Sequence, residues 1–498
     1  MNVNPITRLD YPDPDVIRVE DTYYMVSTTM HFMPGCEILQ SFDLVHWEHV
    51  TYVYETLDHT DAQQLKSGHN IYGQGMWAAS LRYHEGRFYI CFVANDTRKT
   101  YLYTSEKIDG PWKKQLIEGF YHDGSLLFDE DGRNYIVYGN DEIWITELNE
   151  DLTAPKKDGL HRLLVSDHKN PELGYEGSHI QKINGYYYIF LVHSLRDRWM
   201  RTEACFYSDS LEGEFTGGDV LCDDRGYCGQ GVAQGGIVDT PDGKWYAMLF
   251  QDSGAVGRIP ILLPVTWKDH FPVFGQNGHV PEEIEVHSTR PGYIYQPLVG
   301  SDDFCNGLLP RWQFNHDPDP RYYHLDALQG TYTITTREVC TELTQAVNTL
   351  TQRMSYPSCA AEVTVDASAL KEGDVAGLCA LQSCYAAVGI TKHHGKYEVL
   401  MLDKKEDGIL DMTEGTVVES HQMDFRLEAD FCNMKDEARC YYRVNKGDWL
   451  PIGTVHKLYF KLDHFTGCRF GLFCYAAEKT GGSACFRDFK YYDVDEIS

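Results

Sequence analysis

The sequence is poor in positive charge. It has 44 lysine and arginine residues against 74 aspartate and glutamate residues, which gives a formal net charge of −30 over 498 residues. Such a surface repels the phosphate backbone of DNA or RNA, whose binding depends on cationic side chains. The composition therefore argues against a nucleic-acid-binding protein, whereas a neutral ligand such as a sugar would be indifferent to this charge.

Long apolar runs and a leader segment are also missing. No stretch approaches the roughly 20 apolar residues that a membrane helix needs, and residues 1–5 show no basic segment followed by an apolar one. The 15 cysteines are odd in number, irregularly spaced and without a C-x-x-C pair, which disfavours a disulfide framework or a zinc ribbon. We therefore expect a cytoplasmic protein with reduced thiols and no membrane partner.

Long amphipathic helices are absent up to about residue 290, but one β-rich phrase recurs five times. Each copy has an apolar strand, a tight polar turn and an aromatic-rich strand. Turns such as Asn184-Gly185 and Asp242-Gly243 are typical of β-hairpins because glycine tolerates positive φ. The copies recur every roughly 45–65 residues, enough for a four-stranded sheet in each. They begin at residues 16, 80, 126, 180 and 237. Five such sheets arranged radially predict a five-bladed β-propeller.

A second β-rich region follows the repeats. The pattern stops near residue 290, and residues 289–303 read as a linker. Strands are expected at residues 331–334, 361–365, 387–390 and 458–462, where apolar residues alternate with polar ones or form short runs. We therefore expect an all-β protein, with the propeller over residues 1–295 and a β-sandwich over residues 300–498.

Three acidic residues stand just before the first strand of three copies. Asp13 precedes copy one, Asp123 copy three and Glu176 copy four. Equivalent strand ends converge on the axis of a propeller, so these carboxylates are expected to meet at one mouth of its channel. Acids are also common turn residues, so position alone does not decide between a site and a set of turns. If the three meet, one should have a raised pKa while another stays ionised, the pairing that glycoside hydrolysis needs.

The motifs around these acids resemble a known family. The segments Asp10-Tyr11-Pro12-Asp13-Pro14-Asp15, Asp123-Gly124-Ser125 and Glu176-Gly177-Ser178-His179 resemble glycoside hydrolase family 43. That family contains β-xylosidases, α-L-arabinofuranosidases and arabinanases. The tail, from Trp312-Gln313-Phe314 onward, resembles the concanavalin A-like β-sandwich appended to the xylosidase-like members. The resemblance covers essentially the whole chain.

The resemblance implies an inverting hydrolase. Asp13 would be the general base that activates water, Glu176 the general acid that protonates the departing oxygen, and Asp123 the residue that orients Glu176 and keeps its pKa raised. In an inverting pair the two carboxyl groups stand roughly 6.5–9.5 Å apart, and we expect that separation for Asp13 and Glu176. The implied substrates are short plant-polysaccharide oligosaccharides ending in β-D-xylose or α-L-arabinofuranose, cleaved from the chain end because the appended sandwich closes the funnel in such relatives.

Four further residues are candidates for substrate binding. Trp77, before the second copy, is expected to line the sugar pocket, with a core tryptophan as the alternative. Arg258 matches an arginine that hydrogen-bonds the terminal sugar in relatives, with a surface salt bridge as the alternative. His31 and Phe32 are expected to border the pocket.

A metal or other cofactor is not expected. Many relatives carry a histidine just before the Gln-Gly-Gly of the fifth copy, where it helps to hold a central calcium ion or water cluster. This chain has Ala233 at that position, which puts an axial calcium in doubt.

Other functions stay open on the sequence alone. A non-catalytic glycan-binding propeller would use the same folds, although binding a neutral sugar does not require three clustered carboxylates. A related fructosidase is disfavoured because the chain lacks both an Asn-Asp-Pro start and an Arg-Asp-Pro segment. A galactan-acting exo-glycosidase, the choice between xylose and arabinose, and the formation of a homo-oligomer all stay open.

Overall fold

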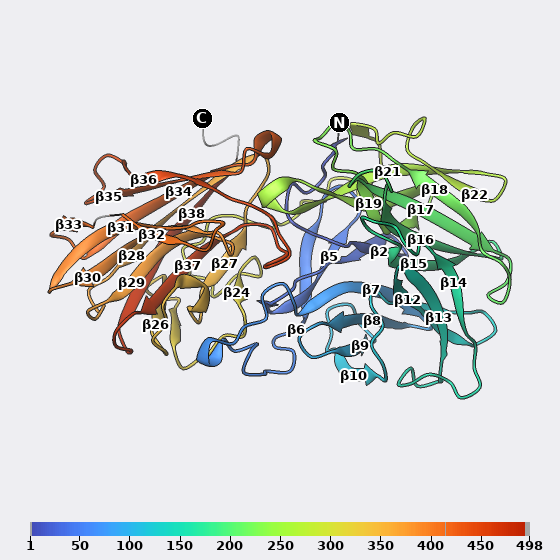
Figure 1. Ribbon diagram of the computed structural model, residues 1–498, viewed down its shortest axis with the longest axis horizontal. Helices are drawn as coiled ribbons and strands as arrows, with labels where there is room; N and C mark the ends of the chain where they lie inside the picture. Colours follow the sequence, from blue (N-terminus) through green and yellow to red (C-terminus); the bar gives the residue numbers. More distant parts are fainter. Residues whose placement is uncertain (1, 414, 494–498) are drawn as a thin grey trace.

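The computed structural model describes residues 2–413 and 415–493, and these residues form two lobes of β-structure (Figure 1). Helix is limited there to four single 3₁₀ turns: η1 (Lys66–Gly68), η2 (Gly254–Val256), η3 (Leu343–Gln345) and η4 (Cys432–Met434). None of them is long and apolar enough to cross a membrane, and no other helix lies in the described part of the chain. The cysteines, all of which are described, form no disulfide.

Five four-stranded antiparallel sheets form the larger lobe, and each runs in chain order from an inner to an outer strand. Blade one contains β2 (Asp15–Val19), β3 (Thr22–Val26), β5 (Gly35–Ser41) and β6 (Glu48–Tyr54). Blade two contains β7 (Met76–His84), β8 (Arg87–Ala94), β9 (Lys99–Ser105) and β10 (Lys113–Ile117). Blade three contains β11 (Ser125–Phe128), β12 (Asn134–Asn140), β13 (Glu142–Leu148) and β14 (His161–Ser166). Blade four contains β15 (Glu176–Ile183), β16 (Tyr186–Ser194), β17 (Arg201–Ser208) and β18 (Thr216–Leu221). Blade five contains β19 (Val232–Asp239), β20 (Trp245–Asp252), β21 (Arg258–Lys268) and β22 (Phe271–Phe274). The five inner strands contact one another in a closed ring, so the predicted five-bladed propeller is confirmed.

The start of the chain lies along blade five and closes the ring. β1 (Asn2–Val3) pairs with β23 (Glu283–Ile284). The Asn4 side chain then donates to the Leu262 carbonyl (2.8 Å) and accepts the Leu262 N–H (3.1 Å). Further along, the Tyr11 N–H donates to the Arg258 carbonyl at 3.0 Å. This path carries the acidic segment after Tyr11 directly past Arg258.

Hydrogen bonds from side chain to main chain pass from blade to blade at the axis. In three successive blades, the polar side chain that opens the inner ladder accepts the backbone N–H of an apolar residue in the next blade. These bonds join Asp15 to Leu81 (2.7 Å), Ser80 to Leu126 (3.2 Å) and Ser125 to Ile180 (3.1 Å). An inner strand is the edge strand of its own sheet, so the N–H groups on its unpaired edge need hydrogen-bond acceptors from outside that sheet. The bonds therefore fix the register of one blade against the next.

Arg82 adds a second set of bonds at the axis. Its guanidinium donates to the Asp15 carboxylate (2.8 Å), the Leu126 carbonyl (2.9 Å), the Ser125 hydroxyl (2.7 Å) and the Ile180 carbonyl (3.2 Å). One side chain of blade two thus joins blades one, three and four.

Asp15 balances the charge of Arg82. Its second oxygen lies 3.1 Å from Nδ1 of His179, in blade four. Burial alone would raise the pKa of Asp15, but Arg82 and His179 hold this pKa below its usual value. The axis is therefore filled by an ionised, hydrogen-bonded group of charges.

Replacing Arg82 should destabilise the whole propeller. In Arg82→Met, Asp15 is left buried without its cation, which costs about 3–5 kcal/mol. The thermal unfolding midpoint should fall well below that of the wild type. Arg87→Met, which removes an exposed guanidinium from the same hairpin, should change the midpoint little. Equal midpoints for the two variants would contradict the proposed role of the axial bonds.

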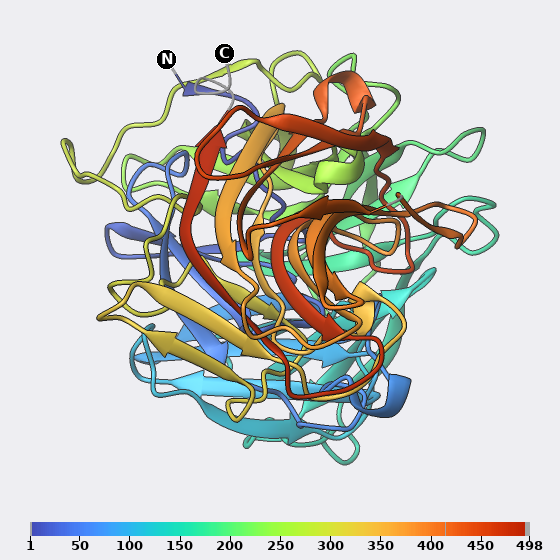
Figure 2. The same ribbon diagram turned by 90° about the vertical axis from the view of Figure 1, so that its left-hand side faces the viewer.

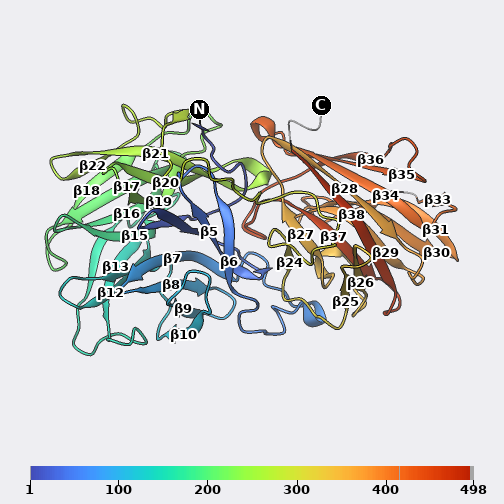
Figure 3. The same ribbon diagram turned by 180° about the vertical axis from the view of Figure 1, so that it is seen from behind.

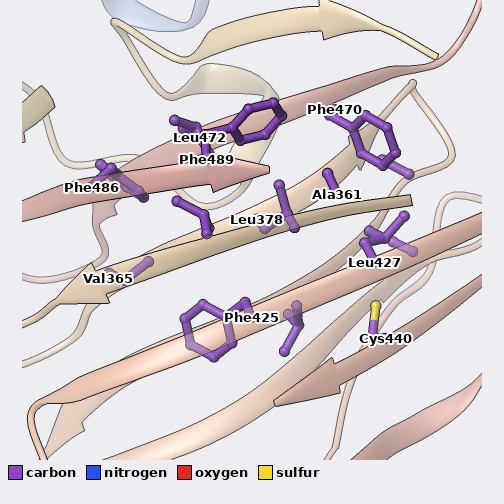
Figure 4. Packing of buried hydrophobic residues seen from close by; sticks show 14 of the residues in the cluster. Ala361, Val365, Leu378, Phe425, Leu427, Cys440, Phe470, Leu472, Phe486 and Phe489 are labelled. Atoms are coloured by element: carbon purple, nitrogen blue, oxygen red, sulfur yellow. The ribbon is translucent and has the colours of Figure 1, made fainter. Parts of the chain in front are cut away.

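The smaller lobe is a sandwich of two antiparallel sheets (Figure 3). The first sheet has the order β32 (Leu410–Met412), β31 (Lys396–Lys404), β30 (Ala386–His393), β29 (Asp374–Leu381), β37 (Arg469–Ala476), β27 (Leu350–Arg353), β24 (Gln313–Asn315) and β4 (Phe32–Met33), with β33 (Thr416–Val418) also paired to β31. The second has the order β25 (Tyr323–Asp326), β26 (Thr331–Thr335), β38 (Ser483–Asp493), β28 (Ser358–Asp366), β34 (Gln422–Asp430), β35 (Glu437–Arg443) and β36 (Leu450–Lys457). Apolar side chains of both sheets fill the space between them, as Leu378, Phe425 and Leu472 show in Figure 4. Such alternation of inward apolar residues is what holds a β-sandwich together.

One expected strand of the sandwich is wrong. β36 ends at Lys457, and residues 458–462 continue as a loop. The apolar residues in this segment do not alternate across a sheet. Leu458 is buried in the sandwich core, and Tyr459, Phe460 and Leu462 lie on the wall of a cavity in the propeller. The pattern of apolar residues thus arose from contact between the lobes.

The two lobes share a sheet. β4 belongs to a loop of blade one, yet it pairs with β24 at the edge of the first sandwich sheet. Figure 2, viewed from the sandwich side, shows that lobe stacked over the propeller. At this interface Arg353 of the sandwich bonds Glu37 of blade one at 2.8 Å, with both side chains buried. Burial would raise the pKa of Glu37, but Arg353 and His49 lower it to about 2. The two lobes are therefore joined both by backbone pairing of strands and by a buried ion pair.

Candidate active site

The segments that open the five inner strands place two rings of residues around the axis. We define the first ring as Pro12, Trp77, His122, Glu176 and Ala233, and the second ring as the residues that follow them, Asp13, Ala78, Asp123, Gly177 and Gln234. All five second-ring residues have positive φ, of 52°, 24°, 48°, 67° and 65°. In blades two, four and five the strand also bulges at this point. Bulges next to active sites re-aim side chains, and here they direct them into the channel mouth.

The three predicted acids meet in one cavity of about 730 Å³ at this mouth. Asp13 and Asp123 occupy equivalent positions in the second ring. The sequence predicted that Glu176 is equivalent to these two residues. The structure places it one position earlier, in the first ring with Trp77 and His122. The difference matters because a shift of one residue changes the direction in which a strand side chain points.

Asp13 is held by two donors. Arg258 Nη1 donates to its Oδ1 at 2.8 Å, and the Thr28 hydroxyl donates to its Oδ2 at 2.5 Å. The same Thr28 oxygen accepts the N–H of Ala78 at 2.8 Å. Both oxygens of Asp13 are therefore fixed in direction by donors from other segments.

Asp123 and Glu176 lie together around His122. His122 Nε2 is 3.6 Å from Asp123 Oδ2 and 3.6 Å from Glu176 Oε2. The charge of Asp123, followed by that of Glu176, raises the pKa of His122 to about 9 despite its burial. Burial raises the pKa of Asp123 to about 6, with Glu176 and Asp13 adding to the rise and His122 opposing it. The pKa values of His122 and Asp123 therefore each depend on the charge of the other.

His122 was not predicted from the sequence. The sequence offered one signal, which is that His122 directly precedes Asp123. This position is equivalent to those of Trp77 and Glu176 in their own blades. That equivalence becomes visible only when the strand bulges are known. The imidazolium supplies the positive charge that lets neighbouring carboxylates share a small, dry volume.

One group of side chains in the described part of the chain has a spacing that would suit a metal ion. It consists of His122, Asp123 and Glu176, whose ligand atoms lie within 4.8 Å of one another. A histidine ligand must be unprotonated to bind a metal. The raised pKa of His122 favours a proton on the imidazole at neutral pH. The site is therefore arranged as a cluster of ion pairs. Ala233 is buried in the first ring and offers no ligand atom.

The structure places Trp77 and Arg258 in the wall of the same cavity. The Arg258 side chain is only 2% exposed and lies over the ring of Phe465, 4.3 Å from its centroid. The Trp77 ring packs against Phe465 at 5.4 Å and meets His122 edge-on at 6.1 Å. Both residues therefore lie beside the acids.

His31 and Phe32 lie elsewhere, so their predicted place at the edge of the pocket is corrected. Both are buried at the lobe interface and are not part of the cavity wall. The His31 ring packs against Phe32 at 4.3 Å and against His316 of the sandwich at 4.8 Å. Phe32 belongs to β4, so it is drawn into the sandwich sheet.

The sandwich closes one side of the cavity. The loop after β36 contributes wall residues from Lys457 to Leu462 and then Phe465, and the turn before β35 contributes Met434 and Asp436. Asp436 accepts the N–H of Ala255 in the propeller at 3.0 Å. A wall built from two lobes turns an open channel mouth into a pocket.

Several buried polar atoms on this wall make no hydrogen bond within the described part of the chain. They are Trp77 Nε1, His122 Nε2, Arg201 Nε, Asp252 Oδ1, and Nε and Nη2 of Arg258. Buried polar atoms are normally hydrogen-bonded, so such a set marks a space for a polar ligand. Donors and an acceptor together suit a molecule rich in hydroxyl groups.

Arg201 and Asp252 were also missed by the sequence reasoning. They form an ion pair between blades four and five, and the Arg201 guanidinium lies 5.1 Å from the ring centroid of Trp199 at the cavity mouth. Burial lowers the pKa of Arg201 to about 10, with Arg258 adding to the effect. No local motif marks either residue.

Comparison with known proteins identifies the family of the chain. Residues 3–272 match the model of glycosyl hydrolases family 43, and residues 301–492 match the β-xylosidase C-terminal concanavalin A-like domain. The first match covers more than half of the sequence. The chain therefore belongs to glycoside hydrolase family 43, and its architecture is that of a propeller hydrolase with an appended sandwich.

Relatives with this arrangement are similar over the full length. The chain is 26% identical to a β-xylosidase of Formosa agariphila, over 99% of this chain and 89% of the relative. It is 24% identical to a xylosidase/arabinosidase of Butyrivibrio fibrisolvens, over 99% of both. Among solved structures, a bifunctional GH43-CE protein of Bacteroides eggerthii superposes with a TM-score of 0.93 and 42% identity. This chain is matched over its whole length and spans 64% of that protein.

Replacing His122 should make stability less dependent on pH. The folded-state pKa of His122, about 9, exceeds its usual value of 6.5. Its stabilisation is therefore fully present at pH 6.5 and is lost as the pH rises through 9. We expect wild type to exceed His122→Asn in stability by about 3 kcal/mol near pH 6.5, with the gap closing by about pH 10. Thermal unfolding across this range checks it.

The matched control is His168→Asn, which removes an exposed histidine between blades three and four. It should follow the wild-type pH dependence. A gap between wild type and His122→Asn that stays constant from pH 6.5 to 10 would contradict a charged His122.

Proposed function

We propose that the protein is an inverting exo-glycosidase that releases terminal β-D-xylose or α-L-arabinofuranose from short oligosaccharides of plant polysaccharides. The cluster of Asp13, Asp123 and Glu176 in one closed cavity carries this proposal. Inverting hydrolysis needs one carboxylate to activate water and one carboxylic acid to protonate the leaving oxygen.

Charge pairing supports the assignment of roles. Asp13 pairs with Arg258, and Asp123 faces His122 while accepting the N–H of Gly177 at 3.0 Å. Arg258 thus serves Asp13 alone, whereas Asp123 and Glu176 share His122, and Glu176 also accepts a hydrogen bond from the Asn140 amide at 2.7 Å. We therefore assign Asp13 as the base, Glu176 as the acid, and Asp123 as the group that orients the acid.

The closed wall supports action at a chain end. The sandwich segment from Lys457 to Phe465 forms one wall of the cavity, and we propose that this wall stops a polysaccharide from continuing past the site. A terminal sugar fits such a pocket, whereas an internal one requires an open groove on both sides. Short imported oligosaccharides in the cytoplasm are the substrates we propose on this basis.

Relatives support the sugar class. The names of the relatives given above refer to xylosidase or arabinosidase activity. A solved GH43 enzyme with a TM-score of 0.86 and 28% identity was engineered to show endo-xylanase and exo-arabinofuranosidase activity. The alternatives, a galactan-acting exo-glycosidase and a non-catalytic glycan-binding propeller, are outcomes of the experiment below.

Variants of the proposed acid and base should respond differently to the leaving group. Glu176→Gln removes the proton donor, so the rate of xylobiose hydrolysis should fall by about 10²–10⁴-fold. The rate of hydrolysis of a nitrophenyl pentoside should fall much less, because nitrophenolate leaves without being protonated. Asp13→Asn removes the base and should slow both substrates alike. Initial rates on both substrates provide the measurement.

Glu214→Gln, an exposed carboxylate of blade four, is the matched control and should retain the wild-type rate. If the wild type binds pentosides but hydrolyses neither of the two substrates, the result favours the glycan-binding alternative. If it acts only on galactosides, the proposed sugar is wrong. Equal losses of Glu176→Gln on both substrates would overturn its role as the acid.

Product patterns should distinguish action at chain ends. With xylotriose to xylohexaose, the first products should be xylose and the chain shortened by one unit, because the pocket admits a terminal sugar alone. Chromatography of early time points gives the pattern, and NMR of the released sugar should show the inverted anomer. Early release of xylobiose or longer fragments would contradict the closed pocket.

A further inference from the structure

We propose that Gln234 is a further site residue, whose amide binds the water that Asp13 activates, and that Glu203 positions it from behind the cavity wall. This inference rests on the proposed hydrolytic function and adds two residues to its machinery. The argument begins with the second ring.

Gln234 is the blade-five equivalent of Asp13 and Asp123 in the second ring. The two other members of that ring, Ala78 and Gly177, have side chains too small to reach a substrate. Inner strands β19 and β2 are neighbours in the closed ring, so Gln234 follows directly on Asp13 around the axis. Its place alone puts an amide beside the proposed base.

Gln234 shares the cavity of the three proposed catalytic acids. The residue is 5% exposed, and it lines the main cavity together with Asp13, Asp123 and Glu176. Within residues 2–413 and 415–493, its amide group has no hydrogen-bond partner. The amide opens onto the cavity, where a water molecule or a sugar hydroxyl can bond to it.

Gly177 shows how close Gln234 lies to the proposed acid. A Cβ atom at Gly177 would meet Gln234 Cγ at 2.7 Å and Nε2 at 3.0 Å. The amide therefore occupies the space that a side chain next to Glu176 would fill. Gln234 thus lies at the floor between the acid and the base.

The backbone of Gln234 needs an acceptor that its own ring does not provide. In blade two the second-ring N–H, that of Ala78, is bound by Thr28; in blade four the N–H of Gly177 is bound by Asp123. For Gln234 the preceding ring member is Gly177, which has no side chain. Glu203 fills this role, and its Oε2 accepts the Gln234 N–H at 2.7 Å.

Glu203 is an unusual residue for the interior of a sheet. It lies on β17, is 0% exposed, and pairs across the sheet with Val192 and Leu221. None of the described lysine, arginine or histidine side chains bonds to it, and Oε1 has no partner. Burial raises the pKa of Glu203 well above its usual value, a direction that favours the protonated carboxyl group.

The cost of burying this group points to a positioning role. An unpaired carboxyl in an apolar interior is unfavourable, and a leucine would pack there without that cost. The hydrogen bond from Gln234 offsets part of the cost and holds Gln234 at φ 65°, a conformation that residues other than glycine rarely adopt. Glu203 thus acts on the reaction through the backbone of Gln234.

A matched set of variants tests both residues. Glu203→Gln keeps a neutral acceptor of the same shape, Glu203→Leu removes the acceptor, and Gln234→Ala removes the amide. On whichever substrate wild type hydrolyses, Glu203→Gln should keep kcat within about threefold. Glu203→Leu and Gln234→Ala should lose about 10–100-fold in kcat with KM within about twofold, because the contact is made to the attacking water.

The double variant separates positioning from a general structural effect. If Glu203 acts through Gln234, then Glu203→Leu should cost little further kcat in a Gln234→Ala background. Thermal midpoints are measured for all variants. If Glu203→Leu does not fold, Gln234→Ala decides alone, and a wild-type kcat for it overturns the proposal.

Three other results would overturn it as well: additive losses in the double variant, an equal loss in Glu203→Gln and Glu203→Leu, or changes confined to KM. The wild-type rate itself tests the proposed function. The ratios between variants test this inference, so the two failures are distinguishable.

Discussion

Hydrogen bonds from a side chain of one blade to the backbone of the next are the constraint on which this structure depends. Asp15, Ser80 and Ser125 each fix the following blade at the axis, and Arg82 joins four blades at once. The two rings at the cavity lie only two and three residues before these side chains in the same segments. The positions of the acids are therefore set by the bonds that hold the blades in register, so that stability and site geometry share one origin.

The site solves an electrostatic problem that any group of three carboxylates creates. Like charges in a small volume repel, and burial disfavours each charge separately. Arg258 from blade five faces Asp13 of blade one, and His122 of blade three faces both Asp123 and Glu176. Because these cations come from different blades, the balance of charge exists only in the assembled propeller. The same assembly gives Asp13 a cation of its own and makes Asp123 and Glu176 share one, and the proposed chemistry uses that asymmetry.

The sandwich is part of the site as well as a neighbour of it. Through β4 and β24 the two lobes share a sheet, and Arg353 and Glu37 add a buried ion pair to their interface. This interface holds the loop that carries Phe465 over Arg258 and beside Trp77. The attached lobe thus supplies one wall of the pocket, and the proposed action on terminal sugars rests on that wall.

The sequence by itself determined the strands, the five repeats, the two lobes and the approach of Asp13, Asp123 and Glu176, because hairpin turns and apolar periodicity are local signals. Only the tertiary structure decided which residues are equivalent around the axis. Strand bulges shift Glu176 into the ring of Trp77 and His122, and they place Gln234 in the ring of Asp13. Contact between the lobes then drew His31 and Phe32 into the interface and residues 458–462 into the cavity wall. Register and lobe contact join residues hundreds of positions apart, and a shift of one residue redirects a side chain, so no local pattern records them.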